Sequence, residues 1–233
     1  SDRVTGFQIA GPRSRDLLSR VTNADVGPGF RFLDARRMTV GMVDCLVQRV
    51  SYTGDLGYEI FCDLTSQRAL FAALWEAGQD LGIRPFGMRA MMSLRLDRFF
   101  GSWQREFSPD YTPAETGLDR FIQWSKNSDF IGREAAEAER ASPPARRLCA
   151  FVVEADDADV QAYEPIWLDG EVRGFCTSGG YSHTARASVA QGFVPREHAA
   201  DGLRVEIEVL GEMRPARLVT EPLFDPEGAR FRN

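Results

Sequence analysis

Apolar and polar residues alternate with a period of two in several short segments of the chain, and other segments have a helical period. Residues 36–52 predict one or two strands, and residues 57–64 predict a further strand. Residues 12–21 predict a short helix with a proline in its first turn. Because strands and helices occur in turn, we expect the first part of the chain to have an α+β fold.

Two more helices are predicted after the strand at residues 57–64. The first has Thr65 as its N-cap and apolar residues at helical spacing, and it ends near Gly82. The second begins near Pro85 and carries methionines at helical intervals. We expect these segments to complete the first domain as a partial ferredoxin-like α/β domain.

The pattern changes after the prolines at 143 and 144. From Leu148 onward, short strands are separated by Gly or Pro turns at intervals of about 8–12 residues, which is typical of a small barrel or sandwich. Hairpins are predicted at Asp169-Gly170 and at Gly211. We therefore expect two domains, residues 1–142 and a C-terminal antiparallel β-barrel at residues 146–233.

Composition narrows the class of protein. The net charge of −6 argues against a nucleic-acid partner, and no apolar run is long enough to predict a membrane helix. Four widely spaced cysteines contain no CxxC pair, so we expect four reduced thiols, and the two histidines form no cluster that would predict a metal site. These features favour the bacterial cytoplasm, with the mitochondrial matrix as the alternative.

The chain begins with Ser1 and opens directly into a strand-like pattern, without the features of a signal peptide. We expect it to be part of a longer protein. The basic residues are almost all arginine, and Lys126 is the single lysine. Arginine holds carboxylates better than lysine does, so arginines are the natural candidates for such contacts.

The segment "VSYTGDLGYEIF" places Glu59 inside a predicted strand, just after a turn with two glycines. Alternation puts Tyr58, Ile60 and Cys62 on one face, and Glu59 and Phe61 on the other. A carboxylate on a covered face needs a partner. That partner is either an internal arginine or a ligand with two parallel N–H donors, beside which Tyr52 offers a ring wall.

Arg89 follows a glycine near the start of a predicted helix. It is either a surface arginine or a clamp for a ligand carboxylate. His183, by contrast, has no nucleophile and acid at a recognised spacing, so we expect it to lie in a turn between strands.

Six segments follow one another along the chain: "YTGDLGYEI", "GMRAMMSLRLDR", "YTPAETGL", "FIGREA", "SGGYSHTARASVAQGFVP" and "EPLFDPEGAR". In this order they resemble the aminomethyltransferase superfamily. That superfamily contains the T-protein of the glycine cleavage system and the C-terminal folate-binding part of dimethylglycine and sarcosine dehydrogenases, which the last segment resembles most.

The resemblance implies a one-carbon transfer to tetrahydrofolate that gives 5,10-methylenetetrahydrofolate. It implies that Glu59 holds the pterin ring, that Tyr52 lines the pocket, that Arg89 lies near the folate, and that Arg230 closes the site. FAD would belong to an upstream domain outside these residues. The one-carbon donor would be a methylamine-derived iminium.

The family's module begins earlier and carries there an aspartate near the folate nitrogen, which no residue here matches. We therefore assign no catalytic residue and expect the chain alone to be inactive. The absent portion would leave an apolar face exposed, so we expect a homodimer. The alternatives are a standalone aminomethyltransferase or folate-dependent demethylase and, in another class, a non-catalytic folate-binding protein.

Overall fold

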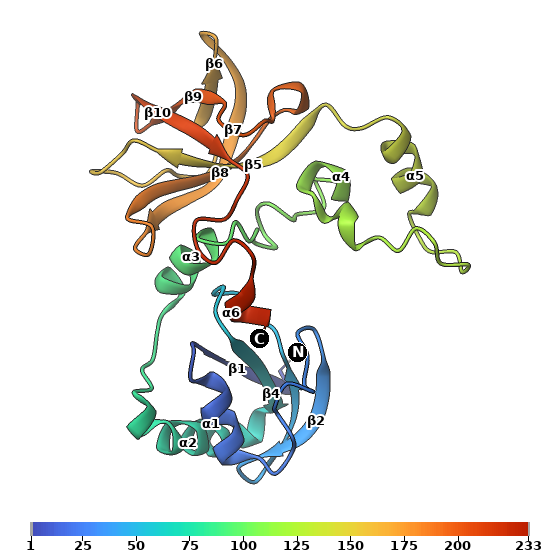
Figure 1. Ribbon diagram of the computed structural model, residues 1–233, viewed down its shortest axis with the longest axis vertical. Coiled ribbons are helices and arrows are strands. Elements are labelled where there is room, and N and C mark those ends of the chain that lie inside the picture. The colour runs from blue at the N-terminus through green and yellow to red at the C-terminus, as the bar shows by residue number, and fades with distance from the viewer. Residues whose placement is uncertain (1, 233) are drawn as a thin grey trace. The chain divides into compact units, whose positions relative to one another are not determined.

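The computed structural model describes residues 2–232, and the chain divides into two compact units. The first comprises the chain up to Arg98 together with the C-terminal segment from Phe224. The second comprises Phe99–Leu223. Figure 1 shows both units as ribbons.

The first unit contains a four-stranded antiparallel sheet with the strand order β1-β4-β3-β2. Its strands are β1 (Val4–Ala10), β2 (Ala35–Val40), β3 (Val43–Gln48) and β4 (Gly57–Asp63). Its helices are α1 (Ser14–Val21), α2 (Gln67–Ala77), α3 (Met88–Leu96) and α6 (Ala229–Arg232). The predicted α+β fold is confirmed.

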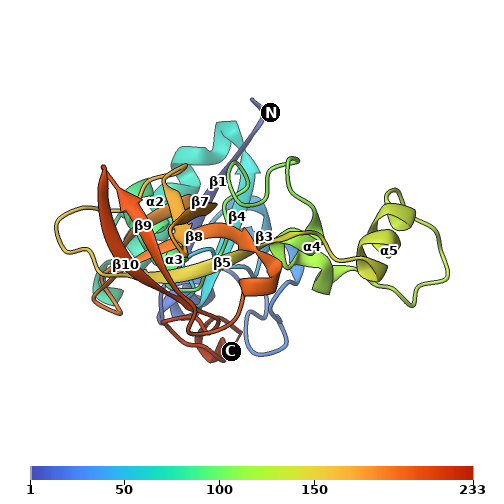
Figure 2. The same cartoon turned by 90° about the horizontal axis from the view of Figure 1, so that it is seen from above.

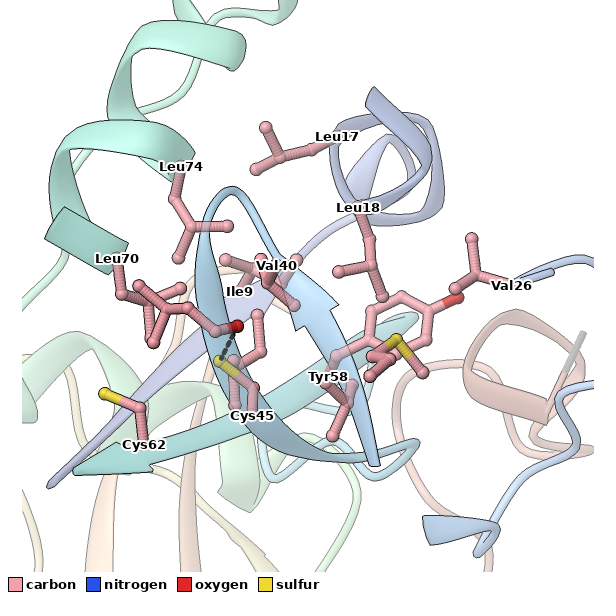
Figure 3. Packing of buried hydrophobic residues seen from close by; sticks show 14 of the residues in the cluster. Ile9, Leu17, Leu18, Val26, Val40, Cys45, Tyr58, Cys62, Leu70 and Leu74 are labelled. Atoms are coloured by element: carbon pink, nitrogen blue, oxygen red, sulfur yellow. Dashed lines mark hydrogen bonds between the residues drawn. The ribbon is translucent and has the colours of Figure 1, made fainter. Parts of the chain in front are cut away.

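One face of this sheet forms a hydrophobic core with α1 and α2. Tyr58, Ile60 and Cys62 of β4 are buried on that face, as their alternation predicts. Leu18 of α1 and Leu70 of α2 pack in the same cluster (Figure 3). Burial of each such leucine side chain stabilises the fold by about 1.5–3 kcal/mol. The other face of the sheet is therefore left for Glu59 and its neighbours.

The helix boundaries differ from two predictions. Thr65 is not a helix N-cap, because it lies in a short 3₁₀ turn in which the Asp63 carboxylate accepts its N–H at 3.0 Å, and α2 begins only at Gln67. Pro85 does not start α3, which begins at Met88 after Gly87. In both cases several nearby residues can begin a helix, so the local pattern alone does not fix its first residue.

The second unit is built on a closed antiparallel barrel with the strand order β10-β5-β8-β7-β6-β9. Its strands are β5 (Arg146–Val153), β6 (Pro165–Leu168), β7 (Glu171–Ser182), β8 (Ala187–Pro195), β9 (Arg204–Val209) and β10 (Glu212–Val219). Strand β8 pairs with both β5 and β7 (Figure 2). The predicted barrel is confirmed.

Both predicted hairpins are present. Asp169 and Gly170 have φ values of 53° and 78°, and Leu210 and Gly211 have φ values of 51° and 85°. Two consecutive residues with positive φ form a type I′ turn, whose twist matches that of the flanking strands. Local sequence alone is sufficient to place these turns.

The segment before the barrel contains α4 (Pro113–Thr116) and α5 (Arg133–Ala141). Glu115 of α4 binds Arg146 of β5 at 2.6 Å, and the buried carboxylate of Glu106 accepts from Ser178 of β7 at 2.5 Å. This segment packs with the barrel and belongs to the same compact unit. The two compact units thus meet between residues 98 and 99. The boundary that we predicted at residues 142–146 separates the segments of the sequence by their patterns, and it stays a prediction.

Candidate ligand-binding site

Three polar side chains cross the sheet of the first unit on the face opposite the hydrophobic core. Glu59 of β4 pairs with Gln8 of β1 on one side and with Gln48 of β3 on the other. Residues that are directly opposite in an antiparallel pair share a face and have Cβ atoms about 4.5–5.5 Å apart. The three side chains therefore form one continuous polar row.

Glu59 is the charged member of this row. It is half-buried, and within residues 2–232 its carboxylate makes no hydrogen bond or ion pair. Burial raises the pKa of the Glu59 carboxyl above its ordinary value. The internal arginine that was one of the two predicted partners is thus absent in the described part of the chain, and the acceptors of Glu59 are open to a ligand.

Gln8 has a similar deficit of partners. Its amide nitrogen Nε2 is buried and has no hydrogen-bond partner. A buried donor without a partner destabilises a fold by about 1–3 kcal/mol. Two adjacent side chains on one sheet face therefore carry unused hydrogen-bonding capacity, an acceptor on Glu59 and a donor on Gln8.

The glycine-rich loop before β4 approaches the same face. A Cβ on Gly57 would lie 3.1 Å from the Cβ of Ser51. Because Gly57 and Glu59 are two residues apart in β4, they share a face, and Ser51 must lie over that face. Tyr52, which is partly exposed, follows directly in the chain. Gly57 is thus required because a side chain there would meet both Ser51 of the loop and the carbonyl oxygen of Ile9 in β1, which would lie only 2.9 Å from a Cβ.

Gly54 permits a second close approach in this loop. It has φ +81°, and a Cβ there would lie 2.3 Å from the Cγ of Arg98. Arg98 donates through Nη1 to the carbonyl oxygen of Phe224 at 2.8 Å, and its guanidinium lies 4.8 Å from the ring centre of Phe231. The loop therefore packs on the end of α3 and on the C-terminal segment.

Arg230 lies in that C-terminal segment, on α6. Its Nη2 donates to the Asp55 carboxylate at 2.9 Å, and its guanidinium lies 5.0 Å from the ring centre of Phe224. The Asp225 carboxylate accepts the backbone N–H groups of Ala229 and Arg230, which fixes the start of α6. The structure thus brings Arg230 to the loop that contains Tyr52.

Arg89 is the candidate that the described contacts do not bring to the others. It lies in the first turn of α3 and is exposed. No hydrogen bond or ion pair of Arg89 is formed within residues 2–232. Its role as a carboxylate clamp stays a prediction.

A groove of about 810 Å³ runs along β1, which forms an edge of the sheet. The groove is lined mainly by apolar residues, including the exposed Phe71, Phe86 and Met88, and it also borders Gln8. That this groove is the apolar face expected where an earlier portion of the family's module would pack stays a prediction. The homodimer that we expected it to form stays a prediction.

The remaining chemistry of the described residues is limited. All four cysteines are free thiols. Within residues 2–232, no group of three or more His, Cys, Asp or Glu side chains could hold a metal ion. None of the helices in that range is long and apolar enough to cross a membrane.

Sequence reasoning missed Gln8 and Asp55 as members of this region. Gln8 could have been found from the alternation of β1. This alternation places the buried Ile9 on one face of the strand and Gln8 on the other face, which is the face of Glu59. Asp55 gave no such signal, because its partner lies 175 residues later in the chain.

Comparisons with known proteins give the relatives of this chain. Residues 1–126 match the model of the GCVT N-terminal domain, and residues 146–225 match that of the glycine cleavage T-protein C-terminal barrel domain. The mitochondrial dimethylglycine dehydrogenase of Homo sapiens is 37% identical over 233 residues, which are 100% of this chain and 27% of that protein. The aminomethyltransferase of Streptomyces avermitilis is 34% identical, with 96% of this chain and 60% of that protein covered.

The fold has a solved counterpart in the glycine cleavage system aminomethyltransferase T from Bartonella henselae. The TM-score is 0.83 at 23% identity, with 96% of this chain and 60% of that chain covered. The chain thus spans 27% of the length of the dehydrogenase and 60% of the aminomethyltransferases named here. Since one family model covers more than half of its residues and a second covers the barrel, the chain belongs to the glycine cleavage T-protein family.

Proposed function

We propose that this chain is the C-terminal tetrahydrofolate-binding, one-carbon-transfer portion of a protein like dimethylglycine or sarcosine dehydrogenase. The observation that carries the proposal is the half-buried carboxylate of Glu59, which has no partner within the described residues. The 37% identity to a dimethylglycine dehydrogenase over the whole chain supports this assignment within the family.

The chemistry of Glu59 fits the aminopyrimidinone part of a pterin. A carboxylate accepts two parallel N–H groups in a bidentate arrangement, and charge-assisted hydrogen bonds of this kind are about twice as strong as neutral ones. Because Glu59 is partly desolvated, it loses less hydration on binding than an exposed carboxylate would. The face beside it carries the loop of Tyr52, whose ring would form a wall of the pocket.

Tetrahydrofolate, when bound, would supply the two amine nitrogens that take up a methylene from a methylamine-derived iminium and release the amine. The role of this chain is to bind the folate and to orient it. Glu59 would hold the pterin, Arg230 and Asp55 would fasten the C-terminal segment to the binding loop, and Arg89 would meet the negatively charged tail of the folate. We assign the proton transfers to no residue of this chain, and oxidation by FAD to a domain outside it.

A standalone aminomethyltransferase is the second candidate, and the 34% identity to the enzyme of Streptomyces avermitilis favours it. The two candidates differ in what precedes this sequence in the gene product. A flavin domain there supports the dehydrogenase, and its absence supports the transferase. For the compartment we propose the bacterial cytoplasm, with the mitochondrial matrix as the alternative, whichever of the two functions holds.

Isothermal titration of the chain with a reduced folate tests the proposal. We expect Glu59→Gln to weaken binding about 10- to 150-fold, which corresponds to a lost charged hydrogen bond of roughly 1.5–3 kcal/mol. Glu76→Gln is the matched control, because Glu76 is exposed on α2, which packs on the opposite face of the sheet. Absence of folate binding by the parent chain, or equal affinity of the Glu59→Gln variant, would overturn the proposal.

A further inference from the structure

We propose that Gln8 is a second ligand-binding residue of this site and that its amide donates to the carbonyl group next to the two N–H groups held by Glu59. The inference rests on the proposed function and deepens it, because it names how the site would recognise one edge of the ligand. It starts from the buried, unpartnered Nε2 of Gln8 beside an unpartnered carboxylate.

Position is the first argument. Gln8 and Glu59 are directly opposite in the β1–β4 pair, so their side chains leave the same face of the sheet. Gly6, the neighbour of Gln8 on that face, has no side chain, and a Cβ there would lie 2.8 Å from the Phe61 ring. The Phe61 ring therefore lies over Gly6 and bounds the polar row on one side with an aromatic edge.

Burial is the second argument. A strand with Ile9 and Phe7 on the core face needs no amide on its other face for folding, and an apolar side chain would fit a covered position without an unused donor. Buried polar groups in proteins usually have partners, and an exception calls for a reason. The ligand of Glu59 supplies that reason, because it would bring the missing acceptor.

Complementarity is the third argument. Glu59 presents only acceptors, and the Nε2 of Gln8 presents donors. A ligand that spans both needs an edge with the order donor, donor, acceptor. The 2-amino-4-oxopyrimidine edge of a reduced folate has this order, in its amino group, its ring N–H and its carbonyl. A rotation of the Gln8 side chain between staggered rotamers would turn the amide toward that carbonyl.

The test compares Gln8→Met, which keeps the length of the side chain but removes the amide, with the parent chain. We expect reduced-folate affinity to fall about 2- to 12-fold, as for the loss of one neutral hydrogen bond. The melting temperature without ligand should stay equal or rise, because an unpartnered buried amide is removed. Gln67→Met is the control, because Gln67 is exposed at the start of α2.

The outcomes separate this inference from the proposed function. If Glu59→Gln weakens binding and Gln8→Met does not, Gln8 is no ligand-binding residue, although the proposed function stands. A lower ligand-free melting temperature of Gln8→Met with unchanged affinity would likewise show a structural role and overturn the inference. If Glu59→Gln has no effect, the proposed function fails, and this inference fails with it.

Discussion

The guanidinium of Arg230 lies 2.9 Å from the carboxylate of Asp55, although the two residues are 175 positions apart in the sequence. This ion pair joins the last helix of the chain to the glycine-rich loop before β4. Asp55 lies three residues after Tyr52 and four residues before Glu59 in the sequence. The C-terminal segment thereby becomes part of the region in which we place the ligand.

The ion pair itself should contribute little stability. Its side chains are 46% and 21% exposed, and pairs of this kind contribute up to about 1 kcal/mol. We expect Arg230→Gln to lower the free energy of unfolding by less than about 1 kcal/mol, with a smaller effect at about 1 M salt. Urea unfolding of Arg230→Gln, Asp55→Asn and the double variant measures the coupling. A coupling energy above about 2 kcal/mol would contradict this.

Gly54→Ala should be more destabilising than Gly82→Ala. Both glycines have positive φ, at +81° and +75°, so each substitution meets a backbone cost of about 1–2 kcal/mol. A Cβ at Gly54 would also overlap the Arg98 side chain, whereas nothing lies within 4 Å at Gly82. Crowding of this kind adds about 1–3 kcal/mol. Equal losses in denaturant unfolding would show that Arg98 moves aside freely.

Glu59→Gln should stabilise the ligand-free chain at neutral pH. Because burial raises the pKa of the Glu59 carboxyl, the folded state holds this proton more tightly than the unfolded state does. The contribution of Glu59 to stability therefore becomes unfavourable as the pH rises from the ordinary to the raised pKa, and it stays so at higher pH. The variant lacks this carboxyl. Its gain in stability over the parent should therefore be absent when the pH is below the ordinary pKa of the carboxyl, and complete when the pH is above the raised pKa.

Thermal unfolding of the parent and of Glu59→Gln between about pH 4 and about pH 8 checks this prediction. Glu76→Gln again serves as the control, since Glu76 is exposed. A melting temperature of Glu59→Gln below that of the parent throughout this range would show that Glu59 has a stabilising partner in the folded chain.

The thiols should react slowly in the native chain. Burial raises the pKa of Cys45 and Cys149 to about 11 and that of Cys176 to about 12. Since the thiolate is the nucleophile, alkylation at neutral pH should proceed much faster in denaturant than in buffer, as mass spectrometry can follow. Fast native labelling of Cys176 would contradict this and would favour a cysteine-dependent role in a non-catalytic folate-binding protein.

Local patterns predicted the elements well where one residue type satisfies one backbone requirement. The turns at Asp169-Gly170 and Gly211 need positive φ, and the alternation around Glu59 needs only the strand period. Thr65 and Pro85 were wrong as helix starts because other residues nearby can also begin a helix, and the local pattern does not decide between them. Nothing in the local pattern assigned the segment before residue 142 to the barrel unit, because Glu106 and Glu115 meet partners far along the chain.

The sequence by itself determined the α+β character of the first part, the barrel of the second, and the side of β4 on which Glu59 lies, because each depends on spacing within a few residues. Only the tertiary structure decided that Glu59 lacks an internal arginine within the described residues, that Gln8 stands beside it, and that Arg230 reaches Asp55. These three facts depend on strand register and on a C-terminal segment that reaches a loop far earlier in the chain. A hydrogen bond between residues 175 positions apart leaves no trace in a local pattern, since either residue alone looks like an ordinary surface charge.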